Sequence, residues 1–203
     1  MMIALVDSGV GNLRSVAKAL EAVGADVRLT ADPSLILSAV KVALPGVGAF
    51  GENMAGLKRR GLVEVVRQVA AQATPLLGIC VGMQVLFEGS DELGDHQGFG
   101  LLPGWVRRFD KPGLKVPQTG WNQITPLGDD PLFQGLPNDS YAYFNHSYYC
   151  DVAEPADQLA TTEYGRLYAS AIRRGHLYGV QFHPEKSQRV GLTILRNFVE
   201  RCP

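Results

Sequence analysis

The sequence is poor in cysteine and has no long apolar run. Its three cysteines, Cys80, Cys150 and Cys202, are widely spaced and form no Cys-x-x-Cys pair. An odd number at irregular spacing favours neither a disulfide framework nor a zinc site, and it is typical of a reducing compartment. The N-terminus lacks a basic region and a cleavage site, and no apolar run approaches membrane-spanning length. We therefore expect a cytoplasmic protein without a metal site.

The sequence also lacks an excess of charge of either sign. Its 203 residues include 19 Lys and Arg against 20 Asp and Glu, which gives a formal net charge of −1. Binding to nucleic acid or to a membrane surface usually requires a basic patch, so the balance favours small-molecule or protein partners. No repeat, linker or low-complexity tract divides the chain. We expect one domain, residues 1–203, large enough to bury a core without disulfides.

The first part of the chain alternates between strand-like and helix-like segments. Short apolar runs predict strands at 3–6, 27–29, 40–44 and 76–79. Apolar residues at helical spacing predict helices over 13–23, from Pro33 after the N-cap Asp32, and over 62–69. This alternation is typical of βαβ units in a doubly wound, mostly parallel α/β sheet. Its active site should lie at the carboxyl ends of the strands.

The pattern changes after Gly94. Strand-like pieces between turn residues occur at 105–109, 121–124, 141–144, 168–172 and 178–182. We expect these strands to be antiparallel and to form a strand-rich subregion of the same domain. Apolar residues at helical spacing from Leu192 to Val199 predict a last helix, packed on the main sheet.

The stretch from Thr74 to Glu88 carries the strongest chemical signal. An apolar run ends at Gly78-Ile79-Cys80-Val81-Gly82, and helical spacing resumes at once, as in a nucleophile elbow. The glycines would remove side chains that collide across the tight turn. The N–H groups of the following helix would favour the reactive thiolate. The alternative is a cysteine that only packs in the core.

A cysteine nucleophile needs a base, and the base needs a group that orients it. His183 closes an apolar strand, and Pro184 should keep the chain extended so that His183 and Glu185 project to the same side. The pattern predicts a triad of Cys80, His183 and Glu185. The alternative for His183 and Glu185 is a polar surface loop after a buried strand. We interpret His146 and His176 as structural.

Gly9-Val10-Gly11 begins like a dinucleotide-binding fingerprint. Arg14 stands where that fingerprint needs its third glycine. We therefore expect no dinucleotide cofactor.

These motifs resemble those of the class I, or triad, glutamine amidotransferases. The resemblance covers nearly the whole chain and rests on residues 45–50, 78–84 and 183–185. Within that family, the chain resembles the glutaminase subunits of imidazole glycerol phosphate synthase, through residues 7–13, 45–50, 120–122, 143–148 and 186–187. The resemblance implies a flavodoxin-like class I glutamine amidotransferase fold and hydrolysis of glutamine to glutamate and ammonia, without a cofactor. It also implies a heterodimer with a cyclase subunit of (β/α)8 barrel fold, which receives ammonia through a channel in histidine biosynthesis.

The resemblance also implies the roles of single residues. Cys80 would attack the amide of glutamine, His183 would pass a proton to the leaving ammonia, and Glu185 would orient His183. The oxyanion hole would consist of the N–H groups of Val47 and Val81. Glutamine would be bound by Gly48, Gln84, Glu92, Ser147 and Tyr148, with Glu92 facing its α-ammonium group. The partner interface would include Asn12, Trp121, Tyr143 and Lys186.

Residues 45–48 predict a conformational switch. Glycines flank Val47 on both sides, so a peptide flip there should be cheap. The Val47 N–H would point away from the site at rest and would be presented when the partner and its nucleotide bind. The alternative is a tight turn after a strand, with no switching.

Three other functions remain open on the sequence alone. The chain could be the glutaminase subunit of another amidotransferase, such as pyridoxal phosphate synthase. It could be a catalytically silent binding domain of the same fold, although the complete set of Cys80, His183 and Glu185 weighs against this. It could also be a cysteine hydrolase that acts on γ-glutamyl conjugates.

Overall fold

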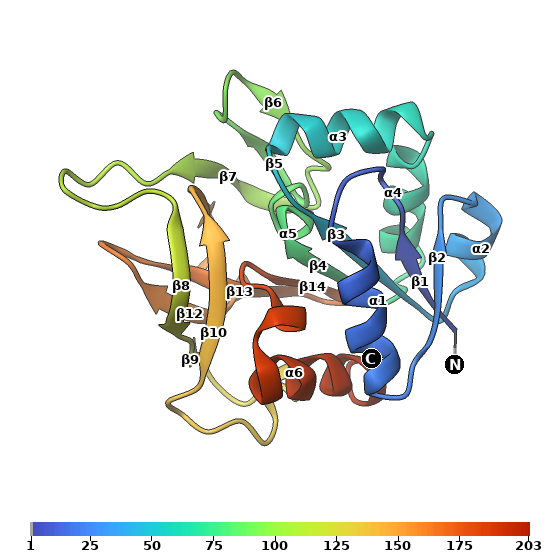
Figure 1. The fold of residues 1–203 in the computed structure, drawn as a ribbon. Helices are drawn as coiled ribbons and strands as arrows, with labels where there is room; N and C mark the ends of the chain where they lie inside the picture. Colours follow the sequence, from blue (N-terminus) through green and yellow to red (C-terminus); the bar gives the residue numbers. More distant parts are fainter. Residues whose placement is uncertain (1) are drawn as a thin grey trace.

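An eight-stranded sheet forms the centre of the computed structural model, which describes residues 2–203 (Figure 1). Its strand order is β2-β1-β3-β4-β14-β13-β12-β9. The strands are β1 (Met2–Val6), β2 (Asp26–Thr30), β3 (Lys41–Gly46), β4 (Leu76–Cys80), β9 (Thr125–Pro126), β12 (Gln158–Glu163), β13 (Leu167–Arg174) and β14 (Leu177–Val180). Strands β1 to β4 and β14 pair in parallel, whereas β9, β12 and β13 pair with their neighbours in antiparallel fashion.

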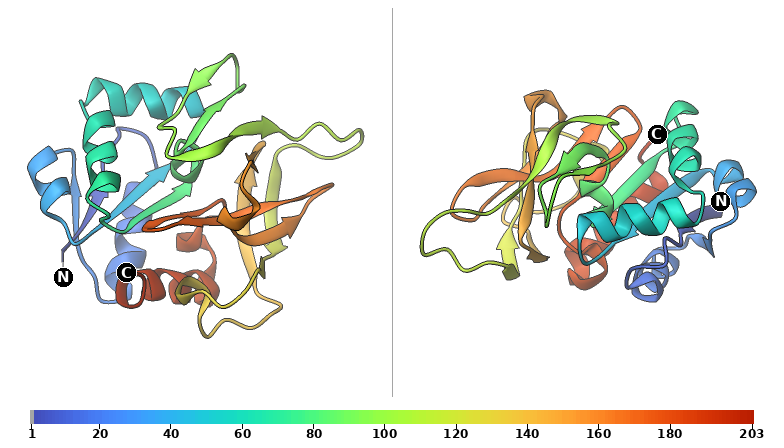
Figure 2. Two further views of the ribbon diagram at one scale, coloured as in Figure 1. Left: turned by 180° about the vertical axis from the view of Figure 1, so that it is seen from behind. Right: turned by 90° about the horizontal axis from the view of Figure 1, so that it is seen from above.

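Helices cover both faces of the parallel part of the sheet. They are α1 (Leu13–Ala22), α2 (Pro33–Ser38), α3 (Phe50–Arg59), α4 (Val63–Ala71), α5 (Val81–Gln84) and α6 (Gln188–Glu200). Helix α1 contacts α6, while α4 contacts both α2 and α3, and the two groups lie on opposite sides of the sheet (Figure 2). The sequence-based prediction of a doubly wound, mostly parallel α/β architecture is therefore confirmed.

Two smaller sheets complete the second half. One has the order β11-β7-β5-β6 and the other pairs β10 with β8. Their strands are β5 (Phe87–Ser90), β6 (His96–Gln97), β7 (Leu102–Arg108), β8 (Gln118–Gln123), β10 (Tyr141–His146) and β11 (Tyr148–Val152). Short 3-10 helices are η1 (Pro131–Phe133), η2 (Pro155–Asp157) and η3 (Pro184–Lys186).

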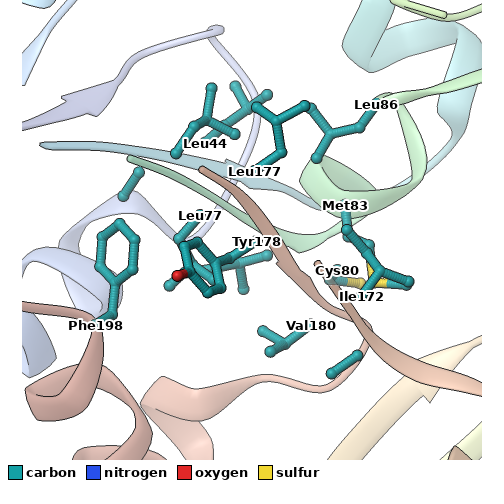
Figure 3. Packing of buried hydrophobic residues seen from close by; sticks show 14 of the residues in the cluster. Leu44, Leu77, Cys80, Met83, Leu86, Ile172, Leu177, Tyr178, Val180 and Phe198 are labelled. Carbon is teal, nitrogen blue, oxygen red and sulfur yellow. The ribbon is translucent and has the colours of Figure 1, made fainter. Parts of the chain in front are cut away.

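Fully buried side chains from β3, β4, β14 and α6 meet in the core (Figure 3). The rings of Tyr178 on β14 and Phe198 on α6 pack edge to face, with centroids 6.1 Å apart. Burial of such rings ties the last helix to the main sheet, as predicted from the sequence. Among residues 2–203, no helix is long and apolar enough to cross a membrane.

The predicted strands and helices of the first half correspond to β1 to β4, α1, α2 and α4. The carboxylate of Asp32 accepts a hydrogen bond of 2.8 Å from Ser34 N, as expected of an N-cap. Helix α3 was not predicted. Its buried residues are Phe50, Asn53, Gly56 and Leu57, so polar and glycine residues interrupt the apolar stripe that identifies a helix.

The predicted helix after Cys80 is wrong beyond its first turn. Helix α5 spans only Val81–Gln84, and strand β5 begins at Phe87. The carbonyl groups of Val85, Leu86 and Phe87 accept hydrogen bonds from the N–H groups of Phe99, Leu101 and Gly100, respectively, at 2.8 to 3.0 Å. The backbone carbonyl groups of residues 85–87 thus form their hydrogen bonds with residues 99–101 rather than within a helix. This pairing overrides the local helical spacing.

The strands after Gly94 pair mostly in antiparallel fashion, as predicted, but β14 and β7 each also have a parallel neighbour. Strand β14 lies parallel to β4, and β7 lies parallel to β5. Because β14 runs beside β4 in the same direction, the chain segments after both strands emerge at the same edge of the sheet. This arrangement brings His183 to the end of the sheet that carries Cys80.

Candidate active site

Cys80 ends β4 and precedes α5, and its backbone is strained. Its φ of 55° lies in the left-handed region that residues other than glycine rarely adopt. A Cβ atom on Gly78 would lie 2.6 Å from the carbonyl oxygen of Gly82, and one on Gly82 would overlap that of Leu44. The tight turn that the sequence predicted around Cys80 is present, and both glycines are required by contact with neighbouring backbone.

His183 and Glu185 form a buried hydrogen-bonded pair. Nδ1 of His183 lies 2.9 Å from Oε1 of Glu185, and their side chains are 5% and 1% exposed. Burial alone would lower the pKa of His183, but hydrogen bonds with Cys80 and Glu185 raise it to about 10. A protonated imidazole beside the sulfur favours the thiolate form of Cys80.

The segment between these two residues is not extended, contrary to the prediction. Pro184–Lys186 forms η3, and His183 is its N-cap residue. The side chain of Glu185 reaches back across this turn to the imidazole. The backbone of His183 is held on both sides, because its N–H donates to Tyr143 O at 2.9 Å and its carbonyl accepts from Ser187 Oγ at 2.7 Å. A proline in the first turn of a short helix explains the bend.

Cys80 and His183 line a cavity of about 460 Å³. The other predicted residues that line it are Asn12, Val47, Gly48, Val81, Gln84, Glu92, Ser147, Tyr148 and Lys186. Glu185 does not line the cavity, and its buried carboxylate contacts Nδ1 of His183. Pro117, Asn145 and His146 also line it and were not predicted as site residues. Among residues 2–203, no group of three or more His, Cys, Asp or Glu side chains is placed to hold a metal ion.

The predicted oxyanion segment is held by a residue that the sequence analysis did not identify. Asn53 on α3 donates from Nδ2 to the carbonyl groups of Val47, at 2.7 Å, and Ala49, at 2.9 Å. Gly46 lies opposite Cys80 in the β3–β4 pairing, and a Cβ atom on it would lie 2.7 Å from Gly82 N. Close packing therefore requires glycine at position 46, whereas Gly48 adopts a positive φ of 75°.

Glu92 is partly buried between the cavity and α3. Its Oε2 accepts a hydrogen bond of 2.6 Å from Phe50 N, in the first turn of that helix. Burial raises the pKa of Glu92 above its ordinary value, and the bond from Phe50 partly opposes the rise. One carboxylate oxygen is thus fixed by the protein, and the group lines the cavity.

Gln84 is oriented by protein groups. Its Nε2 donates to the carbonyl of Tyr148 and to Oε1 of Gln181, both at 3.1 Å. Since both amide hydrogens are used, only Oε1 of Gln84 remains to contact a ligand in the cavity.

The four residues expected at the partner interface lie beside the cavity or line it. Asn12 and Lys186 line the cavity, and Nζ of Lys186 lies 5.6 Å from the ring centroid of Tyr143. Tyr143 in turn contacts Trp121 edge to face at 6.3 Å. Trp121 is 48% exposed and borders a second cavity of about 720 Å³ beside the start of α6. The structure therefore groups these residues on one exposed region next to Cys80 and His183.

Three buried polar residues near the cavity had no predicted role in the site: Asn53 and Gln181 were not singled out, and His146 was interpreted as structural. Asn53, His146 and Gln181 are 2%, 6% and 0% exposed, and each makes hydrogen bonds near the cavity. The only signal in the sequence was a polar residue at a position that otherwise reads as core, such as Gln181 before Phe182. Such a residue must find a partner in the fold, but the sequence does not say which.

Comparison with known proteins identifies the family of the chain. Residues 4–202 match the family described as glutamine amidotransferase class-I. The protein named imidazole glycerol phosphate synthase subunit HisH from Symbiobacterium thermophilum is 51% identical over 97% of this chain and 92% of its own length. The protein of the same name from Moorella thermoacetica is also 51% identical, over 98% of this chain and 94% of its own.

Solved structures show the same fold at low sequence identity. The structure of PurLQS from Thermotoga maritima has a TM-score of 0.75 at 16% identity and covers 98% of this chain and 97% of its own. A crystal structure of a glutamine amidotransferase has a TM-score of 0.76 at 18% identity, with the same coverage. The family match, the two relatives and the Cys80–His183–Glu185 geometry agree. The chain belongs to the class-I glutamine amidotransferase family, in the group of relatives named HisH.

Proposed function

We propose that this chain is the glutaminase subunit of an imidazole glycerol phosphate synthase and acts in histidine biosynthesis. The relatives named HisH, each about half identical over nearly the full chain, support the assignment to this synthase. The observation that carries the chemistry is a strained cysteine beside a buried His183–Glu185 pair at one cavity. We also propose that residues 1–203 act as one domain, because β14 from the second half lies between β4 and β13 in the main sheet.

The proposed reaction has two steps. The thiolate of Cys80 attacks the side-chain carbonyl carbon of glutamine, while the N–H groups of Val47 and Val81 stabilise the oxyanion. The imidazolium of His183 gives its proton to the departing nitrogen, and ammonia leaves behind a γ-glutamyl thioester. His183 then takes a proton from water, which attacks the thioester; glutamate leaves with one proton lost to solvent, and the Cys80 thiolate beside the His183 imidazolium is restored.

Glutamine is recognised at its α-carbon end. The carboxylate of Glu92 pairs with the α-ammonium group, with its position fixed by the bond from Phe50 N. Gln84 presents its Oε1, and main-chain groups at Gly48, Ser147 and Tyr148 complete the pocket. A buried carboxylate that meets an ammonium distinguishes free glutamine from a glutamine side chain in a protein.

The ammonia passes to a cyclase subunit of (β/α)8 barrel fold. The exposed group of Asn12, Trp121, Tyr143 and Lys186 lies next to the cavity and is the proposed docking surface. Docking there places the partner directly beside the point at which ammonia leaves Cys80.

A glutamate-release assay tests this function. The chain is measured alone, with the cyclase subunit, and with the cyclase plus its ribonucleotide substrate. We expect low activity alone and strong stimulation in the full mixture. Cys80→Ala should abolish glutamate release while the complex still forms, whereas Cys202→Ala, which changes a thiol remote from the site, should retain it.

Three outcomes would contradict the proposal. Full activity in Cys80→Ala would exclude the triad. Stimulation by a pyridoxal phosphate synthase subunit rather than by the cyclase would assign another amidotransferase. A preference for γ-glutamyl conjugates over free glutamine would indicate a different hydrolase.

A further inference from the structure

Gln181 lies beside the sulfur of Cys80 and is fully buried. It follows β14, two residues before His183, and its backbone N–H donates to Ser170 O on β13 at 2.9 Å. Its Nε2 lies 3.8 Å from Sγ of Cys80, within range of an N–H···S hydrogen bond. A buried amide that contacts the reacting atom therefore stands close to the base, on the same segment of chain.

The orientation of this amide is fixed by one backbone carbonyl. The carbonyl of Tyr148 can only accept, so the Gln84 atom that lies 3.1 Å away must be Nε2. The second hydrogen of that nitrogen points at Gln181, so Gln181 presents Oε1 to Gln84. The remaining end of the Gln181 amide, its NH2 group, must face the sulfur.

His146 supports the same arrangement. Its Nδ1 lies 2.7 Å from the carbonyl oxygen of Tyr148 and donates to the second lone pair of that atom. The carbonyl oxygen of Tyr148 thus accepts two hydrogen bonds. A reversed Gln84 amide would place its Oε1 against this oxygen, and that contact would be unfavourable. The chain of hydrogen bonds from Tyr148 through Gln84 to Gln181 thus has one consistent direction, and it ends at Cys80.

We propose that Gln181 is a further catalytic residue, which donates a hydrogen bond to Cys80 and stabilises its thiolate, and that Gln84 is its positioning residue. The inference rests on the proposed function, in which Cys80 is the nucleophile. A thiolate accepts a hydrogen bond more strongly than a thiol, so a donor fixed in a water-poor site favours the charged form. The sulfur then has two donors, the imidazolium of His183 and the amide of Gln181.

A purely structural role makes a different prediction. If Gln181 only fills space, an apolar side chain of similar length should leave the reactivity of Cys80 unchanged. Gln181→Met is that substitution, since it keeps the length and removes the donor. Asn197→Leu is the matched control, because Asn197 is also a buried amide, with hydrogen bonds to Leu132 O and Gln134 O on the opposite side of the core.

The test measures alkylation of Cys80 by iodoacetamide as a function of pH, with the labelled cysteine identified by peptide mass spectrometry. We expect Gln181→Met to move the half-maximum of the alkylation profile to higher pH and to slow labelling at neutral pH roughly tenfold or more, the size expected for a hydrogen bond to a charged group. In the glutaminase assay kcat should fall more than KM rises. Asn197→Leu should keep the wild-type profile, with folding of each variant checked by circular dichroism.

Gln181→Glu provides a second variant if Gln181→Met does not fold. It keeps an acceptor for Gln84 and places a carboxylate oxygen against the sulfur, so the shift to higher pH should be larger. An unchanged alkylation profile in a folded variant of either kind would overturn the proposal. Because alkylation needs no glutamine, the two failures are distinguishable: a shifted profile in a chain that does not hydrolyse glutamine would refute the proposed function, and with it the catalytic role of Gln181, but would retain the hydrogen bond from Gln181 to the Cys80 thiolate.

Discussion

In the proposed mechanism Glu185 acts on Cys80 only through His183, so we expect unequal losses of activity when each is removed. His183→Ala removes the group that transfers the proton, so glutamate release should fall by roughly 10⁶, whereas Glu185→Gln should cost roughly 10⁴, as for the base and the orienting carboxylate of a hydrolase triad. The Gln variant keeps an oxygen that can accept from Nδ1 of His183, now 2.9 Å from Glu185, but loses the negative charge. Steady-state rates with the partner present, and circular dichroism for folding, check this. Equal losses in two folded variants would contradict the division of roles.

His146 predicts a loss of stability in mild acid. Burial lowers its pKa from the ordinary 6.5 to about 4, although the carbonyl of Tyr148 opposes the change, and the nearby His183 lowers the pKa further. Between pH 6.5 and 4, the imidazole of His146 therefore binds a proton in the unfolded chain but not in the folded chain. The contribution of neutral His146 to the stability of the fold is complete above pH 6.5 and is lost as the pH falls towards 4. Between pH 7 and 5 the loss should be roughly 2 kcal/mol.

Urea unfolding at both pH values tests this account of His146. His146→Gln should show a smaller loss than the wild type on acidification, by roughly 2 kcal/mol. The control His176→Gln removes an exposed histidine, whose Nδ1 lies 3.1 Å from the carbonyl oxygen of Pro203, and it should behave as the wild type. If all three proteins lost stability equally, the buried histidine would not be the cause.

At the residue scale, the sequence predicts the groups whose chemistry has a fixed spacing and misses those defined by distant contacts. Cys80, His183 and Glu185 were identified because glycines flank the cysteine and a carboxylate follows the histidine by two residues. Gln181 was not, because it bonds to residues brought near by the fold, and Asn53 was not, although it bonds to Val47 and Ala49 in its own segment. Gln181 reaches Gln84 and Cys80, about 100 positions away.

The elbow formed by the end of β4 and the start of α5 tolerates no side chain at position 82. Gly82→Ala would place Cβ in the carbonyl of Leu44, so α5 and β3 would have to separate. We expect a loss of at least 3 kcal/mol in unfolding free energy, in the range of severe core disruption, together with loss of activity. Gly24→Ala is the control, since a Cβ there meets nothing within 4 Å and only the φ of 92° resists it, at a cost of about 1 kcal/mol. Urea midpoints should separate the two, and similar midpoints would contradict this packing argument.

The segment from β3 to α3 carries the hypothesis of a switch at Val47. Gly46→Pro would restrict the backbone there, but it is unsuitable as a test, because any Cβ at Gly46 would lie 2.7 Å from Gly82 N and damage the elbow itself. Asn53→Ala is the better test, since it removes the hydrogen bond to the Val47 carbonyl and leaves Gly46 and Gly48 unsubstituted. If this bond holds the resting form, activity without the partner should rise and the stimulation ratio should fall. A folded Asn53→Ala variant with unchanged activities in both states would argue against a switch held by this bond.

At the element scale, local pattern fails where strands pair with distant segments. The run from Val85 to Phe87 continues the helical spacing of the residues before it but leads into β5. Its carbonyl groups accept hydrogen bonds from the N–H groups of residues 99–101. The direction of β14 could not be deduced from its own residues, since pairing with β4 depends on the connection between them. The helices with a regular apolar stripe, such as α1 and α6, were predicted correctly.

The whole molecule joins its two halves at the reactive site. The first half supplies Cys80 at the end of β4, and the second supplies His183 after β14, its parallel neighbour. The doubly wound architecture was predictable because alternating strands and helices admit few arrangements. The meeting of the two halves was predictable only through the chemistry, since a cysteine nucleophile requires a nearby base.

Direct detection of the covalent intermediate is the most direct test of the account. The chain is mixed with its cyclase subunit, nucleotide and glutamine, quenched in acid, and digested for mass spectrometry. We expect a γ-glutamyl thioester on the peptide that contains Cys80. The adduct should be absent from the peptides that contain Cys150 and Cys202, and it should be absent from every peptide of His183→Ala. Glutamate formation at the wild-type rate by Cys80→Ala, with no adduct on any cysteine, would contradict it.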